Sequence, residues 1–181
     1  MSSTMMYATS EKHEAFRKKV REFAEKRVKP VAFELDQNNE FPDEIVKAMG
    51  DSELGIMGIP YEKEYGGAGL DALHYAIAVE ELSRVDGGVG VILSAHTSLG
   101  SYPIAAFGND AQKKKYLVPL AKGEKIGAFG LTEPEAGSDA GGTQTTAELD
   151  GDYYILNGGK IFITNAGKAD IYIVFAVTTP G

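Results

Sequence analysis

The chain has 181 residues, no cysteine and a formal net charge of −8. This length suits one domain, or one domain with part of another, and it can bury a core without disulfides. The lack of cysteine excludes disulfide scaffolds, zinc fingers, iron–sulfur ligation and thiol catalysis. The acidic balance is the opposite of what a general nucleic-acid-binding protein needs.

The longest apolar stretches fall short of the roughly 20 residues that a membrane helix requires. Residues 1–7 show neither a charged segment before an apolar one nor an Arg-rich amphipathic pattern, so no secretory or organelle leader is predicted. We therefore expect a soluble protein of the cytoplasm, with no membrane and no nucleic-acid partner.

The first half of the chain has the pattern of helices. Ser10 is a plausible N-cap, and apolar residues at helical spacing follow as far as Val28. Pro30 should kink or end this helix, although residues 31–35 could continue it. Pro42 suits the first position of a second, short helix.

A glycine-rich segment, residues 65–70, resembles a phosphate-binding loop only superficially. A Walker loop ends in Gly-Lys-Ser/Thr, whereas Leu70 and Asp71 follow here. We favour a tight loop before a helix over 71–85 that is capped by Asp71.

Residues 87–107 are apolar on nearly every side, which predicts a buried central helix. His96 lies on it with no His, Asp or Glu three or four residues further on, so a buried, hydrogen-bonded histidine is favoured over a metal ligand. No metal site is expected. The lysines at 113–115 are interpreted as a solvated helix face rather than a phosphate-binding patch.

After Gly123 the pattern changes to strands, and Asp150-Gly151 and Asn157-Gly158 are hairpin signals. The predicted strands are 126–131, 143–149, 153–156, 160–164 and 171–178. Helices first and strands afterwards give an α+β fold: an all-α domain over 1–122, then the start of an antiparallel β domain over 123–181. So few strands cannot close a barrel, which predicts an incomplete domain.

The segment 130–142 is the most informative one for chemistry. A strand runs into a polar loop whose glycines and hydroxyls suit the polar edge of a planar heterocycle or a phosphate chain. From the residues alone, an ordinary strand–loop connection is an equally good interpretation.

Four segments together resemble the acyl-CoA dehydrogenases. Residues 130–142 resemble the first signature of that family, and residues 156–166 resemble its second flavin-contacting strand. Residues 65–69 and 79–84 match its N-terminal helical domain. The resemblance runs from about residue 10 to the end of the chain and is closest to the short-chain, butyryl-CoA branch.

This resemblance implies an oxidoreductase that binds FAD and a fatty acyl-CoA thioester. In the family, a carboxylate removes the α-proton and a hydride passes to the flavin, which leaves a trans-2-enoyl-CoA. An electron-transfer flavoprotein is the usual acceptor, and the full-length enzymes are tetramers. Acyl-CoA oxidases and flavin-dependent monooxygenases share parts of this architecture, so oxygen stays open as the acceptor.

The first signature implies several cofactor contacts. The backbone of Phe129 and Leu131, and both the backbone and the hydroxyl of Thr132, are expected at the pyrimidine side of the flavin. Ser138 is expected near the diphosphate and the pantetheine arm, so it is a candidate for both cofactor and substrate binding. Glu133 is interpreted as a structural hydrogen-bond acceptor and not as a base.

The second motif implies three more cofactor-binding residues. Phe162 is expected to lie against the isoalloxazine, where many relatives have tryptophan, and Thr164 is expected close to flavin N5, with Ile163 between them. Without the motif, a core strand residue would be the favoured interpretation of Phe162.

Family members are about twice as long as this chain. The resemblance therefore implies that the catalytic glutamate, the contacts to the adenine end of FAD and most tetramer contacts lie outside these residues, so no catalytic residue is assigned here. Two hypotheses follow. The chain is the N-terminal part of a short-chain acyl-CoA dehydrogenase, or it is a non-catalytic fragment that acts as an assembly or interaction module.

Overall fold

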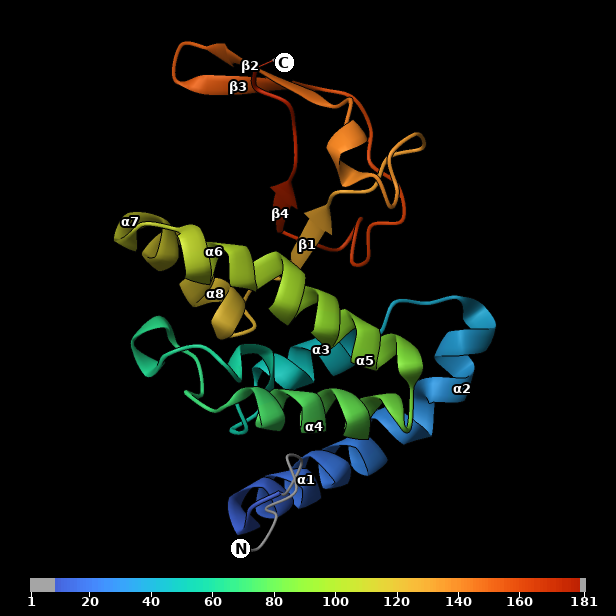
Figure 1. Cartoon of the computed structure of the whole chain (residues 1–181). Helices are drawn as coiled ribbons and strands as arrows, with labels where there is room; N and C mark the ends of the chain where they lie inside the picture. Colours follow the sequence, from blue (N-terminus) through green and yellow to red (C-terminus); the bar gives the residue numbers. More distant parts are fainter. Residues whose placement is uncertain (1–8, 180–181) are drawn as a thin grey trace, which may run out of the picture.

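A computed structural model describes residues 9–179 of the chain. The expectation that there is no leader concerns residues 1–7, which lie outside this range. Helices form one part of the molecule and the strands stand on one side of it (Figure 1). The α-helices are α1 (Glu11–Phe23), α2 (Lys29–Asn38), α3 (Asp43–Gly50), α4 (Ala72–Ser83), α5 (Gly87–Ser94), α6 (Tyr102–Phe107), α7 (Asp110–Gln112) and α8 (Val118–Ala121).

Shorter helical turns connect these elements. The π-helical turns are η1 (Ala24–Val28), η4 (Ala95–Ser101) and η5 (Lys113–Leu117), and the 3-10 turns are η2 (Ile56–Gly58), η3 (Lys63–Tyr65) and η6 (Ala140–Gly142). No helix among residues 9–179 is both long and apolar enough to cross a bilayer.

Two of the predicted helix starts, at Ser10 and Asp71, are confirmed. The Ser10 hydroxyl accepts a hydrogen bond from the His13 amide at 3.3 Å, and the Asp71 carboxylate accepts one from the His74 amide at 3.0 Å. Pro30 does not end the helix, because η1 places it at the start of α2, where a missing N–H costs little. Pro42 is the N-cap of α3 and not its first helical residue.

The glycine-rich segment is the tight loop that was predicted. Gly66 has a φ of 83°, which favours glycine. A Cβ on Gly67 would lie 2.1 Å from the carbonyl oxygen of Tyr61, so only glycine fits between the two backbones.

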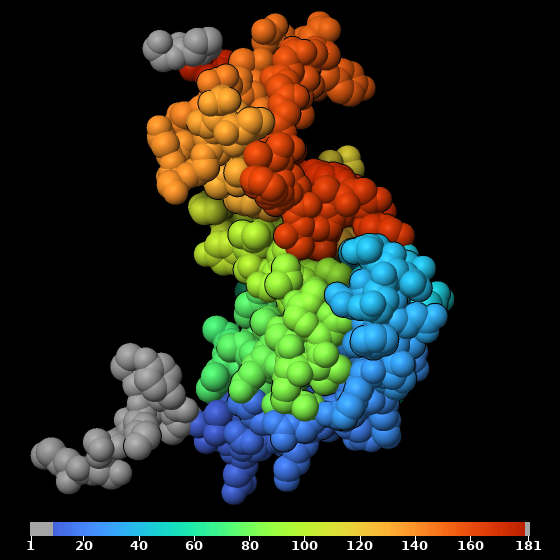
Figure 2. Space-filling model, turned by 90° about the vertical axis from the view of Figure 1, so that its right-hand side faces the viewer, coloured from blue at the N-terminus to red at the C-terminus, as the bar shows by residue number. Residues whose placement is uncertain are grey.

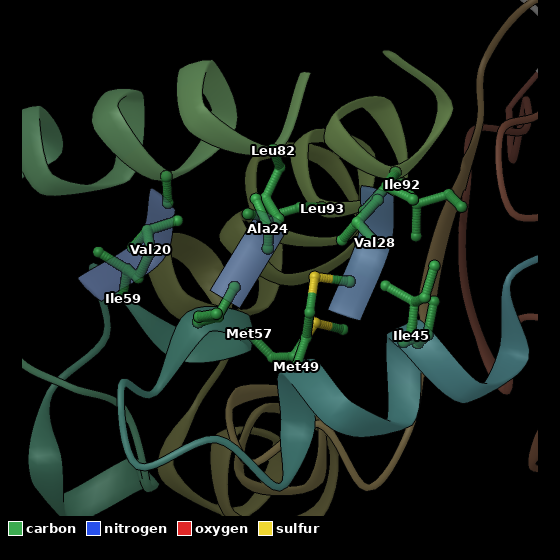
Figure 3. Close-up of a cluster of buried hydrophobic side chains, with 14 of the residues drawn as sticks. Val20, Ala24, Val28, Ile45, Met49, Met57, Ile59, Leu82, Ile92 and Leu93 are labelled. Carbon is green, nitrogen blue, oxygen red and sulfur yellow. The ribbon is translucent and has the colours of Figure 1, made fainter. Parts of the chain in front are cut away.

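The larger of two apolar clusters packs α1, η1, α3, α4 and α5 together (Figure 3). Figure 3 shows α1 and η1 facing α3, with the side chains of α4 and α5 closing the cluster from above. Its fully buried members include Val20, Ala24, Val28, Met49, Met57, Ile59, Leu82 and Leu93.

The helix formed by α5, η4 and α6 separates this cluster from the strands (Figure 1). A Cβ on Gly100 would lie 2.7 Å from Gly127 in the first strand, so a small residue here permits the close contact. The prediction of a helix buried on every side is wrong for one face, because Val91, Tyr102 and Phe107 are exposed, Phe107 by 84%.

The strands are β1 (Gly127–Gly130), β2 (Thr146–Asp150), β3 (Tyr153–Asn157) and β4 (Ile171–Val174). The hairpin signal at 150–151 is confirmed, since β2 and β3 pair antiparallel with Asp150 opposite Tyr153. The expectation of a purely antiparallel sheet is corrected: β1 and β4 pair in parallel, with Gly127 opposite Ile171. The long segment between them returns the chain to the same end of the sheet.

The strand predicted over 160–164 is wrong. Residues 158–170 form turns and irregular structure, and Phe162 and Asn165 have φ values of 55° and 70°. These left-handed conformations cannot continue a strand. The apolar run misled the prediction, because contacts to distant segments decide the conformation here.

The C-terminal segment also contacts the helices. Lys168 Nζ donates to the Asp43 carboxylate at 2.7 Å and lies over the Phe41 ring. Figure 2 shows this red segment against the cyan residues that join α2 and α3. The turn over residues 164–168 is therefore anchored to the helical layer.

Candidate functional site

The end of β1 leads directly into the segment with the first signature. Glu133 and Ala136 close a tight turn through two backbone hydrogen bonds, Glu133 N to Ala136 O at 3.0 Å and Ala136 N to Glu133 O at 3.2 Å. The turn places the side chain of Glu133 inside the loop, and the residues that follow it, including Ser138, are exposed.

The Glu133 carboxylate is the hydrogen-bonding centre of this loop. It is only 5% exposed. It accepts hydrogen bonds from Lys160 Nζ at 2.6 Å, from the Gln144 amide at 2.7 Å and from the Thr145 amide at 3.0 Å. These donors, Lys160 above all, lower the pKa of Glu133 to about 2. The carboxylate is therefore an ionised structural acceptor, as predicted.

Lys160 joins the two motifs. Its Nζ also donates to the carbonyl oxygen of Leu131 at 3.0 Å, and the neighbouring Ile161 amide donates to the carbonyl oxygen of Thr132 at 2.9 Å. Sequence reasoning did not find Lys160, which lies 27 residues from Glu133. A lysine at the head of an otherwise apolar run was the available signal.

Three of the predicted cofactor-binding residues lie at the end of β1 or just beyond it. Phe129 is the next-to-last residue of β1, and its half-buried ring lies 5.2 Å from that of Phe175. The half-buried Leu131 and Thr132 come directly after the end of the strand at Gly130. Ser138 lies further along the exposed part of the loop. The roles of these residues toward a cofactor stay predictions.

The second motif presents its aromatic residue to solvent. Phe162 is 88% exposed, so the interpretation as a core strand residue is wrong. Ile163 and Thr164 are half-buried, and Thr164 lines a cleft of about 490 Å³ together with Phe41, Asp86 and other residues of the helical part. An exposed aromatic ring held in a left-handed turn is a feature that packing within this segment does not explain.

Asn165 ties the second motif to the helical layer. Its Nδ2 donates to the carbonyl oxygens of Gly127 at 3.1 Å and Ile92 at 3.3 Å, which joins β1 to α5. The side chain is buried, and its Oδ1 has no partner within the described residues. Sequence reasoning also missed this residue, although an Asn before Ala-Gly suggested a turn.

His96 in η4 is fully buried and bonds to the start of β1. Its Nδ1 accepts from the Gly127 amide at 3.1 Å, so its Nε2 donates to the Leu120 carbonyl oxygen at 3.2 Å. Burial lowers the pKa of His96 to about 4. The expectation of a buried, hydrogen-bonded histidine is confirmed.

Comparison with known families agrees with this geometry. Residues 10–124 match the acyl-CoA dehydrogenase N-terminal domain, and residues 128–181 match the acyl-CoA dehydrogenase middle domain. The chain therefore belongs to the acyl-CoA dehydrogenase family.

Individual relatives are similar over nearly all of the chain. The short-chain-specific acyl-CoA dehydrogenase of Clostridium acetobutylicum is 60% identical over 174 residues, which are 96% of this chain and 45% of the relative. The butyryl-CoA dehydrogenase structure from Megasphaera elsdenii has a TM-score of 0.90 at 48% identity, and the match covers 97% of this chain and 46% of that one. The chain thus spans less than half the length of these relatives.

A chain in the structure of the electron-transferring flavoprotein of Acidaminococcus fermentans has a TM-score of 0.92 at 51% identity. The match covers 97% of this chain and 46% of that one. The predicted order of a helical part followed by a few strands is therefore the fold of this family.

Proposed function

We propose that this chain supplies the flavin- and substrate-contacting part of an FAD-dependent acyl-CoA dehydrogenase that acts on short-chain substrates. The observation that carries the proposal is the Glu133–Lys160 linkage, because it holds the two signature segments side by side. The proposed reaction is α,β-dehydrogenation of the thioester to the trans-2-enoyl-CoA.

The described residues fit FAD. The Ile161 amide bonds to the backbone of Thr132, and the exposed Phe162 is the next residue after Ile161. An aromatic surface beside a polar strand end fits a planar heterocycle, and the exposed Ser138 hydroxyl offers a contact for a phosphate chain. When bound, FAD would accept the hydride from the β-carbon.

The chain's own residues would bind and orient the ligands. Leu131 and Thr132 would hold the polar edge of the cofactor, Phe162 and Ile163 would cover its ring, and Thr164 would offer a hydroxyl. Glu133 and Lys160 act as positioning residues, because they touch the loop and not the reacting atoms. No residue of the chain is proposed as the α-proton base.

The substrate and partners follow from the relatives. The names short-chain-specific and butyryl-CoA dehydrogenase support a short acyl-CoA. The similarity to a chain in an electron-transferring flavoprotein structure supports such a flavoprotein as the electron acceptor. We also propose a homo-oligomer and a place in the cytoplasm.

A chimera tests the activity. The chain would be fused to the portion of the Megasphaera elsdenii butyryl-CoA dehydrogenase that lies C-terminal to the matched region. Dehydrogenation of butyryl-CoA with an artificial electron acceptor is the expected result. A folded, flavin-loaded chimera that turns over no acyl-CoA of any chain length would refute the proposal.

Flavin binding by the 181-residue chain tests the role of the Glu133–Lys160 linkage. The Lys160→Met variant should weaken FAD binding about tenfold or more, because it frees the loop that holds the cofactor. Lys168→Met is the matched control, since Lys168 pairs with Asp43 at the helical layer and should leave the affinity unchanged. Equal affinities in both variants would contradict the positioning role.

An assembly module is the second candidate function. The β2–β3 hairpin exposes Leu149, Tyr153, Tyr154 and Leu156, an apolar surface that a partner could bury. Bleaching of the flavin absorbance by butyryl-CoA without oxygen can be measured on the FAD-loaded chain. An unbleached flavin fits both candidate functions, so the activity of the chimera is needed to separate them. A stable chain whose chimera is inactive would favour the module.

A further inference from the structure

Helix α1 lies at the side of the helical layer away from the strands (Figure 1). Three side chains from α1 and the start of α4 lie close together. They are His13 in α1, Asp71 at the start of α4 and His74 in its first turn. His13 Nε2 lies 3.0 Å from Asp71 Oδ2, and His74 Nδ1 lies 2.7 Å from Asp71 Oδ1. One ligand atom from each side chain falls within 4.8 Å of the others.

We propose that His13, Asp71 and His74 form a binding site for a divalent transition metal, with Zn²⁺ as the best match. Two imidazole nitrogens and one carboxylate oxygen are a ligand set that Zn²⁺ accepts. Two ligand atoms about 2.1 Å from a tetrahedral ion lie about 3.4 Å apart. Asp71 Oδ1 lies 2.7 Å from His74 Nδ1 and 3.3 Å from His13 Nε2, so both separations are within about 1 Å of that value.

The ligands are already held in place. Asp71 is fixed as the cap of α4, because its Oδ1 accepts from the His74 amide at 3.0 Å. His13 Nδ1 lies 3.0 Å from the Ser10 hydroxyl oxygen. In this structure His13 Nδ1 accepts from the Ser10 amide at 3.0 Å, so Nε2 carries the proton that faces Asp71. Zn²⁺ binding at Nε2 requires this proton to leave and Nδ1 to be protonated, with the Ser10 hydroxyl oxygen within reach as its acceptor. A hydrogen bond at the second ring nitrogen is typical of metal-binding histidines.

The cluster is open to solvent on the side of Asp71. The two histidine side chains are mostly buried, whereas that of Asp71 is 59% exposed. Three protein ligands with one side open to solvent is the arrangement of a zinc site that keeps a water ligand. A bound ion would connect α1 to α4 across 58 residues of sequence.

Without an ion, both histidines can donate to Asp71 and hold the same helices together by hydrogen bonds alone. The experiment therefore has to distinguish metal binding from a purely structural cluster. The sequence composition helps, because the chain has no cysteine and only one further histidine, His96, which is fully buried.

Isothermal titration of the tag-free, EDTA-treated chain with ZnCl₂ tests the site. We expect one Zn²⁺ per chain, with His13→Gln and His74→Gln each weakening the affinity about tenfold or more. Asp71→Asn should weaken it too while keeping the helix cap, since Asn and Asp cap equally well. Asp86→Asn is the matched control, because Asp86 caps α5 in the same way.

Thermal unfolding gives a second measurement. Zn²⁺ at 100 times its Kd should raise the Tm of the unaltered chain by about 5–10 °C. The His13→Gln variant should show no such rise. Histidine NMR signals of residues 13 and 74 should shift with Zn²⁺ while those of His96 stay in place.

Two results would overturn the proposal. One is the absence of zinc-dependent heat and of any Tm shift in the unaltered chain. The other is an unchanged affinity in the folded His13→Gln and His74→Gln variants, which would place the bound ion elsewhere.

Discussion

Replacing Asn165 with alanine should destabilise the junction between the helical layer and the strands. Its Nδ2 makes two buried hydrogen bonds, to the carbonyl oxygens of Gly127 and Ile92. Each such bond contributes about 1 kcal/mol. Asn165 also has a φ of 70°, a conformation that costs alanine about 1 kcal/mol. The free energy of unfolding should therefore fall by about 3 kcal/mol.

Urea unfolding followed by circular dichroism measures this change. Asn165→Gly is the matched variant, because glycine tolerates the positive φ but lacks the amide. It should lose about 2 kcal/mol, so the difference between the two variants isolates the backbone contribution. A fall of less than about 0.5 kcal/mol in Asn165→Ala would refute the reasoning, since that is the size of an ordinary surface substitution.

Two further predictions concern the loops. The pKa of Glu133 is lowered to about 2 from an ordinary value of 4.5, so its ionisation stabilises the fold above about pH 4.5 and this stabilisation disappears as the pH falls toward 2. Glu133→Gln should have a lower free energy of unfolding than the unaltered chain at pH 7, and this difference should shrink between pH 4.5 and 2. Urea unfolding at a series of pH values measures it. A difference that stays constant with pH would contradict the assignment. Gly67→Ala should unfold at a lower urea concentration than Gly159→Ala. A Cβ at residue 67 would lie 2.1 Å from the Tyr61 carbonyl oxygen, whereas nothing lies within 4 Å of one at residue 159. Equal unfolding midpoints would show that the loop adapts.

Several local features could be predicted from the sequence alone. The caps at Ser10 and Asp71 and the hairpin at 150–151 depend on residues within a few positions of one another. Such preferences act along the chain and need no distant partner. The order of helices and strands and the family signatures are also properties of the linear sequence.

The tertiary structure decided what depends on distant residues. Lys160 meets Glu133 across 27 residues, Asn165 meets Gly127 across 38, and His13 meets Asp71 across 58. The apolar run at 160–164 has a strand-like pattern, yet Phe162 takes a left-handed conformation. A local sequence pattern indicates the conformation that a segment prefers by itself. Buried hydrogen bonds that form only in the folded chain can outweigh this local preference.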